Sequence, residues 1–320
     1  MNKLENISVS NMTTIRIGGE AEFVYFPENP DELISLIYEL REKKIPWSVL
    51  GGGSNVLISS KGVKGALICT TSMEWITKTS PETIVVGAGT RLPRLASHTS
   101  QLGLSGCEFY EGIPGTVGGA VIMNAGAHGH STTDILEKVV LFDTKKLEMI
   151  SLVPSQIAFG YRKSSIDTSR YIVLEAKYRL KQGTMAQIQN QMKFYSKERE
   201  SKQPKGFSCG CIFRNPNPKY SAGKLIDEMG FKGYKIGGAE VSQKHANFIL
   251  NAENANSENM CNIINTIQTQ IWTGKHVWLQ PEIQPLGEFS EEEKVIWLHP
   301  VKRRNNTETN SEELLKIVNS

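Results

Sequence analysis

Two separate glycine-rich segments constrain this chain more than any other feature of its 320 residues. The first, Gly-Gly-Gly-Ser-Asn at residues 51–55, lies between apolar segments expected to be strands at 46–50 and 56–58. Successive glycines let neighbouring backbone N–H groups point into one concavity, which holds a phosphate without needing a cation. A triple glycine alone is equally consistent with a tight β-turn, so this segment has to be interpreted together with the second one.

The second segment is Gly-Ile-Pro-Gly-Thr-Val-Gly-Gly-Ala at residues 112–120, whose glycines allow a ligand to approach the backbone closely. Neither segment is a Rossmann fingerprint or a P-loop, because the required G-x-G-x-x-G and Gly-Lys-Ser/Thr patterns are missing. Two glycine segments predict a ligand with two linked phosphates held between two lobes, and a dinucleotide such as FAD meets that requirement. The apolar residues 116–127 are expected to be a buried loop or turn.

Hydrophobic periodicity predicts alternating helices and short strands. One helix is expected to begin at Pro30, where the missing N–H costs nothing, and to bury Leu33, Leu36, Ile37 and Leu40. Further helices are expected at 91–102, 184–200 and 257–273, the last of them capped by Gly274. The remaining strands are expected at 22–26, 66–69, 83–87, 138–142 and 171–180. The polar break at 201–206 is the best candidate for a domain boundary.

Composition excludes several classes of function. The 36 basic and 33 acidic residues give a net charge of +3, so neither a nucleic-acid nor a membrane partner is expected. The N-terminus lacks the apolar core of a signal peptide, and no apolar run approaches the roughly 20 residues of a membrane-spanning helix, which predicts a cytoplasmic protein. Because the five cysteines are odd in number and Cys209-Gly210-Cys211 is no C-x-x-C zinc pattern, neither a disulfide framework nor a metal site is expected.

A set of motifs occurs in one order along the chain and carries a family resemblance. The motifs are residues 51–55, residues 112–120 with Asn124-Ala125-Gly126, Tyr161-Arg162-Lys163-Ser164, Gly-Cys-Ile-Phe-Arg-Asn-Pro at 210–216, and Pro281-Glu282-Ile283. Over roughly residues 10–288 the chain resembles the UDP-N-acetylenolpyruvoylglucosamine reductases, the MurB family. The short connection at 164–171 is similar to that of the family's shorter subtype, which lacks an extra tyrosine-bearing substrate loop.

The resemblance implies an α+β architecture, a two-lobed FAD-binding fold of the vanillyl-alcohol oxidase type followed by a small α/β substrate-binding domain. The expected boundaries are 1–70 and 71–203 for the lobes, 204–289 for the substrate domain and 290–320 for a tail of no assigned role. No histidine stands in residues 51–55, so FAD is expected to be bound non-covalently. The residues implied in FAD binding are Gly51, Gly52, Gly53, Ser54, Asn55, Gly115, Thr116, Gly118, Gly119, Asn124 and Gly126.

The resemblance also implies an activity, the NADPH-dependent reduction of UDP-N-acetylglucosamine enolpyruvate to UDP-N-acetylmuramate in peptidoglycan precursor synthesis. Hydride would pass from reduced flavin to C3 of the enol ether, and a proton to C2. Arg162 and Glu282 would stabilise the charge that develops at C2 and the carboxylate. Cys211 would donate the proton, a role the family usually gives to serine, so its pH dependence is in question. The residues implied in substrate binding are Tyr161, Ser164, Lys202 and Asn215.

Two other interpretations remain open at this point. Another flavin oxidoreductase of the same fold would share the glycine segments without needing Cys211 and Glu282 together. A non-catalytic homologue that still binds sugar nucleotides would have no need of Arg162, Glu282 and a proton-donating Cys211. The colour of the purified protein and its reaction with oxygen separate these alternatives from the reductase.

Overall fold

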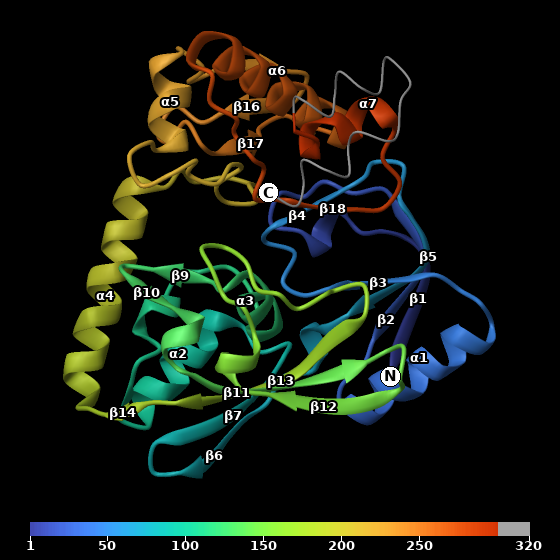
Figure 1. The fold of residues 1–320 in the computed structure, drawn as a ribbon, viewed down its shortest axis with the longest axis vertical. Helices are drawn as coiled ribbons and strands as arrows, with labels where there is room; N and C mark the ends of the chain where they lie inside the picture. Colours follow the sequence, from blue (N-terminus) through green and yellow to red (C-terminus); the bar gives the residue numbers. More distant parts are fainter. Residues whose placement is uncertain (300–320) are drawn as a thin grey trace.

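The computed structural model describes residues 1–299. Two lobes, blue and green in Figure 1, lie side by side, and an orange-to-red unit lies across their upper ends. Helix α4 (Met185–Lys202) runs along the outer side of the green lobe and leads into the third unit. The polar segment expected in the tail, Lys302 to Asn306, lies outside the described residues.

The first lobe is a four-stranded sheet covered by one helix. Strands β2, β5 and β3 are parallel, and β1 adds to the edge antiparallel to β2. Helix α1 (Pro30–Glu42) begins as predicted at Pro30, because Asn29 caps it by accepting a hydrogen bond from the backbone N–H of Glu32. Its predicted apolar stripe is fully buried. The strands of this sheet are β1 (Asn2–Ser8), β2 (Glu20–Phe26), β3 (Trp47–Leu50) and β5 (Val63–Cys69), and the short strand β4 (Val56–Ile58) lies outside it.

The second lobe is a five-stranded antiparallel sheet in the order β12-β11-β13-β7-β6. Its bounds are β6 (Ile76–Ser80), β7 (Thr83–Gly87), β11 (Leu136–Asp143), β12 (Glu148–Leu152) and β13 (Tyr171–Arg179), with two-stranded additions β8 (Leu104–Ser105), β9 (Gly126–Ala127), β10 (His130–Ser131) and β14 (Lys181–Gln182). Helix α2 (Leu92–Gln101) and α4 pack on it through a common apolar core. The predicted strands and both predicted helices of this lobe are confirmed.

One prediction in this lobe is wrong. Residues 116–127 are not simply a loop, because Val117–Met123 form helix α3, which ends at Asn124 in the left-handed conformation (φ 42°). Val-Gly-Gly-Ala has poor helix propensity, so tertiary contacts decide here. The backbone N–H of Gly118 donates to Ala88 O at 2.8 Å. A Cβ on Gly118 would lie 3.2 Å from the Cβ of Ala88, so the glycine lets the helix lie close against the strand end.

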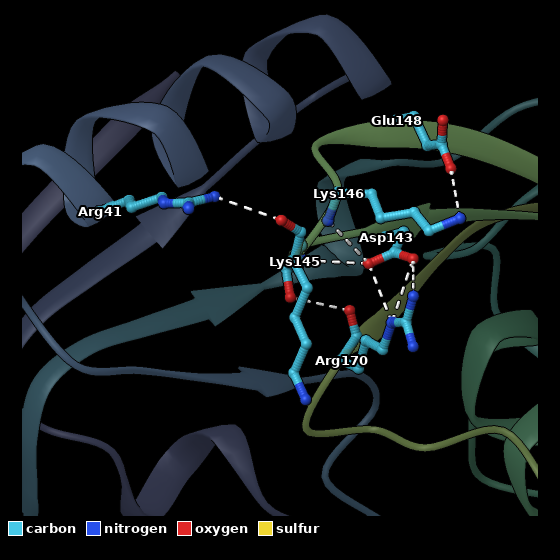
Figure 2. A network of polar contacts seen from close by, with 7 residues as sticks. Arg41, Asp143, Lys145, Lys146, Glu148 and Arg170 are labelled. Carbon is cyan, nitrogen blue, oxygen red and sulfur yellow. Dashed lines mark hydrogen bonds and ion pairs between the residues drawn. The ribbon is translucent and has the colours of Figure 1, made fainter.

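A polar network ties the two lobes together, as Figure 2 shows. The buried Asp143 carboxylate accepts two hydrogen bonds from Arg170 Nε, both at 3.0 Å, and two from the backbone N–H groups of Lys145 and Lys146. From the first lobe, Arg41 Nη1 donates to Lys145 O at 3.4 Å. The network fixes the turn between β11 and β12 and, through Arg170, the chain just before β13.

The third unit packs helices α5 (Ala222–Glu228) and α6 (Ser257–Lys275) on a small sheet of β15 (Lys235–Ile236), β16 (Ala239–Val241) and β17 (Ile249–Asn251). Gly274 was predicted to cap α6, and that is wrong. The left-handed cap is His276 (φ 54°), whose N–H donates to Trp272 O at 3.0 Å. Helix α7 (Glu291–Lys294) and the buried Ile296 pack on the same core, so the described chain continues this unit beyond residue 289.

The third unit is joined to the first lobe by a parallel strand pair. Strand β18 (Gln284–Leu286) pairs with β4, the strand that follows the first glycine segment. Ile15, Ile17 and Leu57 of the first lobe also belong to the core of the third unit. Glu282 is therefore held two residues before a strand that runs beside the end of the glycine segment.

Within residues 1–299, no helix is long and apolar enough to cross a membrane. Within the same described residues, no group of His, Cys, Asp and Glu side chains is arranged to hold a metal ion.

Candidate active site

A cavity of about 1400 Å³ opens where the two lobes and the third unit meet. Both glycine segments line it, and so does the end of α4. The chain before β13 contributes Thr168, Ser169 and Tyr171, and the third unit contributes residues 208–211 and Glu282. The sequence-predicted residues that line it are Gly51, Gly52, Gly53, Ser54, Asn55, Gly115, Thr116, Gly118, Gly119, Gly126, Tyr161, Arg162, Cys211, Asn215 and Glu282.

The two glycine segments lie directly against each other and together form one part of the cavity wall. A Cβ on Gly51 would lie 2.7 Å from Thr116 Oγ1, and one on Gly52 would lie 3.1 Å from Gly115 Cα. Gly53 has a left-handed backbone (φ 63°), and its Cβ would lie 2.1 Å from Met12 O. Side chains are therefore excluded here.

The hydroxyl of Thr116 is buried and has no hydrogen-bond partner within the described chain. Bare backbone and an unused donor are what a diphosphate requires, so this part of the cavity fits the two linked phosphates of FAD.

A second group of polar side chains collects where the third unit meets the cavity. Residues 212–214 pair antiparallel with 280–282: Glu282 N donates to Ile212 O at 2.7 Å, and Arg214 N donates to Gln280 O at 3.0 Å. The buried Asn247 side chain holds the same strand from the other side, through Phe213 N at 2.9 Å and Phe213 O at 2.8 Å. The pairing places Cys211 and Glu282 on neighbouring strands at one wall.

Arg162 reaches this wall from a tight turn of the second lobe. It has a left-handed backbone (φ 56°) between the paired residues Gly160 and Lys163. Its Nη1 donates to Gly126 O at 2.9 Å, and its Nε lies 3.5 Å from Glu282 Oε1. Burial raises the pKa of the Glu282 carboxyl, while the charges of Arg162 and Arg214 oppose that rise.

Comparison with known proteins agrees with this geometry. Residues 202–286 match the C-terminal domain of UDP-N-acetylenolpyruvoylglucosamine reductase, and residues 21–145 match an FAD binding domain. Curated proteins named UDP-N-acetylenolpyruvoylglucosamine reductase are similar along most of their length. The one from Caldanaerobacter subterraneus is 39% identical over 88% of this chain and 93% of its own, and the one from Acaryochloris marina is 41% identical over 89% and 93%.

The crystal structure of the UDP-N-acetylenolpyruvylglucosamine reductase (MurB) from Thermus caldophilus is also similar. It superposes with a TM-score of 0.75 at 33% identity, covering 89% of this chain and 98% of the other. The chain belongs to the UDP-N-acetylenolpyruvoylglucosamine reductase family. It is an FAD-containing oxidoreductase with NADPH as its reductant, and it has the family's FAD-binding domain and C-terminal domain.

Cys211 departs from the serine that is usual in the family. Burial, and next the charge of Glu282, raise the pKa of its thiol to about 11, although Arg162, Arg199 and a hydrogen bond involving Asn247 act in the opposite direction. A thiol with this pKa is protonated at neutral pH, so it remains able to donate a proton. Cys209 also lines the cavity, but it is buried in the core of the third unit, whereas Cys211 is partly exposed.

Three sequence-predicted residues do not line the cavity. The ammonium of Lys202 pairs with Glu198 on the exposed side of α4, so the geometry does not support a substrate contact. Ser164 Oγ donates to Ile122 O at 2.8 Å, and Asn124 Nδ2 donates to Gly160 O at 3.2 Å. Both of these side chains hold the turn that carries Arg162 against the end of α3.

Arg199 lines the cavity and was missed in the sequence. Burial and the neighbouring charge of Arg162 lower the pKa of its guanidinium, and its Nε has no hydrogen-bond partner in the described chain. The sequence contains a signal for this residue. Arg199 follows Ile188 and Tyr195 at helical spacing, so it lies in phase with the buried stripe of α4 rather than with its exposed face.

Proposed function

We propose that this member of the reductase family reduces UDP-N-acetylglucosamine enolpyruvate to UDP-N-acetylmuramate with NADPH, and that Arg162, Glu282 and Cys211 carry the chemistry at the cavity wall. The observation that carries the proposal is the meeting of these three side chains from three separate segments. FAD held against the two glycine segments would supply the hydride for this reduction.

Arg162 and Glu282 act on the negative charge that develops at C2 and spreads into the substrate carboxylate. The planar Arg162 guanidinium has an unpartnered Nε and matches a carboxylate in shape. Burial raises the pKa of Glu282, which favours the protonated carboxyl, and in that form it would donate a hydrogen bond to the developing charge. Both groups are held by the protein in advance, so little reorganisation opposes the reaction.

Cys211 then donates its proton to C2. Its thiol lies at the same wall, close enough that the charges of Glu282, Arg162 and Arg199 all act on its pKa. A thiol is a stronger acid than a serine hydroxyl, so this chain keeps a donor at the position where the family usually has serine. The substitution preserves the role while changing the acidity of the donor.

Arg199 supplies positive charge to the anionic part of the substrate. It lies on the cavity side of α4, whereas Lys202 points away. A half-buried guanidinium next to a second one is stabilised by an anionic ligand. Tyr161 and Asn215 line the cavity as further substrate contacts. The substrates are small molecules of the cytoplasm, and the proposal requires neither a nucleic-acid nor a membrane partner.

A spectrum of the purified protein tests the proposal. We expect the yellow flavin absorption to bleach when NADPH is added under anaerobic conditions, and to return when UDP-N-acetylglucosamine enolpyruvate follows. Colour that returns only with oxygen would indicate a flavin oxidase of the same fold instead. Protein purified without flavin, and unable to take it up, would indicate a non-catalytic homologue.

A further inference from the structure

The backbone of Glu282 is anchored at both of its polar groups. Its N–H donates to Ile212 O at 2.7 Å. Its carbonyl oxygen accepts two hydrogen bonds, from Asn55 Nδ2 at 3.2 Å and from Gln284 Nε2 at 2.8 Å. The first of these joins residues that are 227 positions apart in the sequence. The carboxyl group therefore projects from a backbone whose position depends on Asn55.

Asn55 is the last residue of the first glycine segment. Its backbone carbonyl accepts a hydrogen bond from Gln284 N at 2.9 Å, and the parallel pairing of β4 with β18 begins directly afterwards. Asn55 was expected among the FAD-binding residues, and its side chain donates to the backbone of Glu282. The segment that faces the diphosphate site and the segment that carries the acid form one hydrogen-bonded unit.

We propose that Asn55 is a positioning residue. It couples FAD binding at the first glycine segment, residues 51–55, to the position of the Glu282 carboxyl. The inference rests on the proposed function for the role of Glu282. A neutral acid has to lie within about 2.6–3.2 Å of the atom that accepts its hydrogen bond, and a displacement of about 1 Å lowers a rate by as much as a factor of a hundred. Coupling is reciprocal, so a ligand that fixes residues 51–55 in place also fixes the position of Glu282.

The chain offers a matched control four residues further on. Ser59 Oγ donates to Glu288 O, which is another side-chain bond from the first lobe to the backbone of the same segment. Ser59 is not among the residues that line the cavity, and its partner lies six positions beyond Glu282. Ser59→Ala removes a comparable bond without touching the acid, whereas Asn55→Ala removes the bond at the acid.

Turnover at saturating FAD, NADPH and substrate is the first measurement. We expect Asn55→Ala to lower turnover about tenfold and Ser59→Ala to change it less than about twofold. When Asn55→Ala is added to Glu282→Gln, the further loss should be less than about threefold, because Asn55 acts through Glu282. Asn55→Ala protein with a weaker Kd for FAD but wild-type turnover at saturation would overturn the inference.

Hydrogen exchange of the backbone amides, followed by mass spectrometry, is the second measurement and does not depend on activity. We expect added FAD to slow exchange in residues 280–286 of the wild type and of Ser59→Ala. In Asn55→Ala this protection should be lost, while residues 112–120 stay protected by FAD. Equal protection of 280–286 in all three proteins would overturn the coupling. If Glu282→Gln retained wild-type turnover, the acid's proposed role would fail, but the exchange data would still decide the coupling.

Discussion

The guanidinium of Arg162 and the carboxyl of Glu282 face each other with Nε 3.5 Å from Oε1, and no hydrogen bond joins them. The two groups come from the second lobe and the third unit, and Arg162 is instead fixed through Nη1 to Gly126 O. Because the two groups are not hydrogen-bonded, the Nε–H of Arg162 remains available to a ligand. An incoming carboxylate is the group that such a donor prefers.

The pair gives a prediction for Glu282. Burial raises its pKa, so the carboxyl stays protonated to a higher pH than usual, and activity should fall as the pH rises through that value. Glu282→Ala should lower kcat by about 10²- to 10³-fold, and Glu282→Gln by less, because the amide still donates a hydrogen bond. Profiles of kcat against pH check this. A Glu282→Gln profile with an unchanged alkaline fall would contradict the assignment.

Cys211 gives a second prediction, on proton donation. Cys211→Ser should retain turnover within about tenfold, and Cys211→Ala should lose about 10²- to 10⁴-fold in product formation. Reduction of the flavin by NADPH should continue in both variants. Because the thiol has a pKa of about 11, its donor form is present below that pH and is lost only as the pH rises through it. Stopped-flow absorbance separates the two half-reactions, and equal product formation in Cys211→Ala and wild type would contradict the role.

Much of the site could be predicted from the sequence because its chemistry is local. The glycines of the first segment follow one another directly, and the structure places them against the second segment as two facing loops. Arg162, Cys211 and Glu282 each stand in a short motif, and all three line the cavity. The resemblance to a family, rather than residue spacing, linked these distant motifs to one another.

The failures are positions at which tertiary contacts decide. Helix α3 forms from a glycine-rich stretch because Gly118 packs on Ala88, and no local propensity signals that contact. The resemblance implied Lys202 as a source of positive charge for the substrate, but its ammonium pairs with Glu198 one turn earlier on α4. Helical phase does not separate the two residues, because Arg199 follows the buried Tyr195 by four positions and Lys202 by seven; the structure shows that Arg199 is the one that lines the cavity. The bond from Asn55 to Glu282 spans most of the chain and has no counterpart in sequence spacing.

Arg199 and Lys202 give a third prediction because they form a natural pair for comparison. Arg199→Ala should raise the KM for the UDP-sugar by about tenfold or more, since it removes half-buried positive charge from the cavity wall. Lys202→Ala removes an exposed ammonium that already pairs with Glu198 and should leave KM within about twofold. Steady-state kinetics measure the KM of both variants. A larger rise in KM for Lys202→Ala than for Arg199→Ala would indicate that Lys202, and not Arg199, contacts the substrate.

Gly53 gives a fourth prediction, on the cofactor loop. Gly53→Ala should weaken FAD binding and lower the Tm, because a Cβ would lie 2.1 Å from Met12 O and the left-handed backbone disfavours alanine by about 1–2 kcal/mol. Gly230 is the control, since it is also left-handed (φ 76°) but a Cβ there would meet no atom within 4 Å. Gly230→Ala should lower the Tm alone. Fluorescence titration with FAD measures the affinity of each variant, and thermal unfolding measures its Tm. Equal FAD affinity in the two variants would contradict a role of the first glycine segment in holding FAD.

Asp143 gives the last prediction, on the polar network at the turn between β11 and β12 (Figure 2). Arg170 holds the pKa of this carboxyl well below its usual range, so its contribution to stability is present above the unfolded-state pKa of about 3.9 and is lost as the pH falls toward the folded value. Asp143→Asn should therefore lower the Tm at pH 7, and the difference in Tm from wild type should become smaller as the pH falls. Glu148→Gln is the control, because its pairing with Lys146 is exposed and should contribute little at any pH. Thermal unfolding from pH 7 to about pH 3 measures both differences. A difference in Tm between Asp143→Asn and wild type that stays constant over this range would show that the carboxylate charge does not stabilise this network.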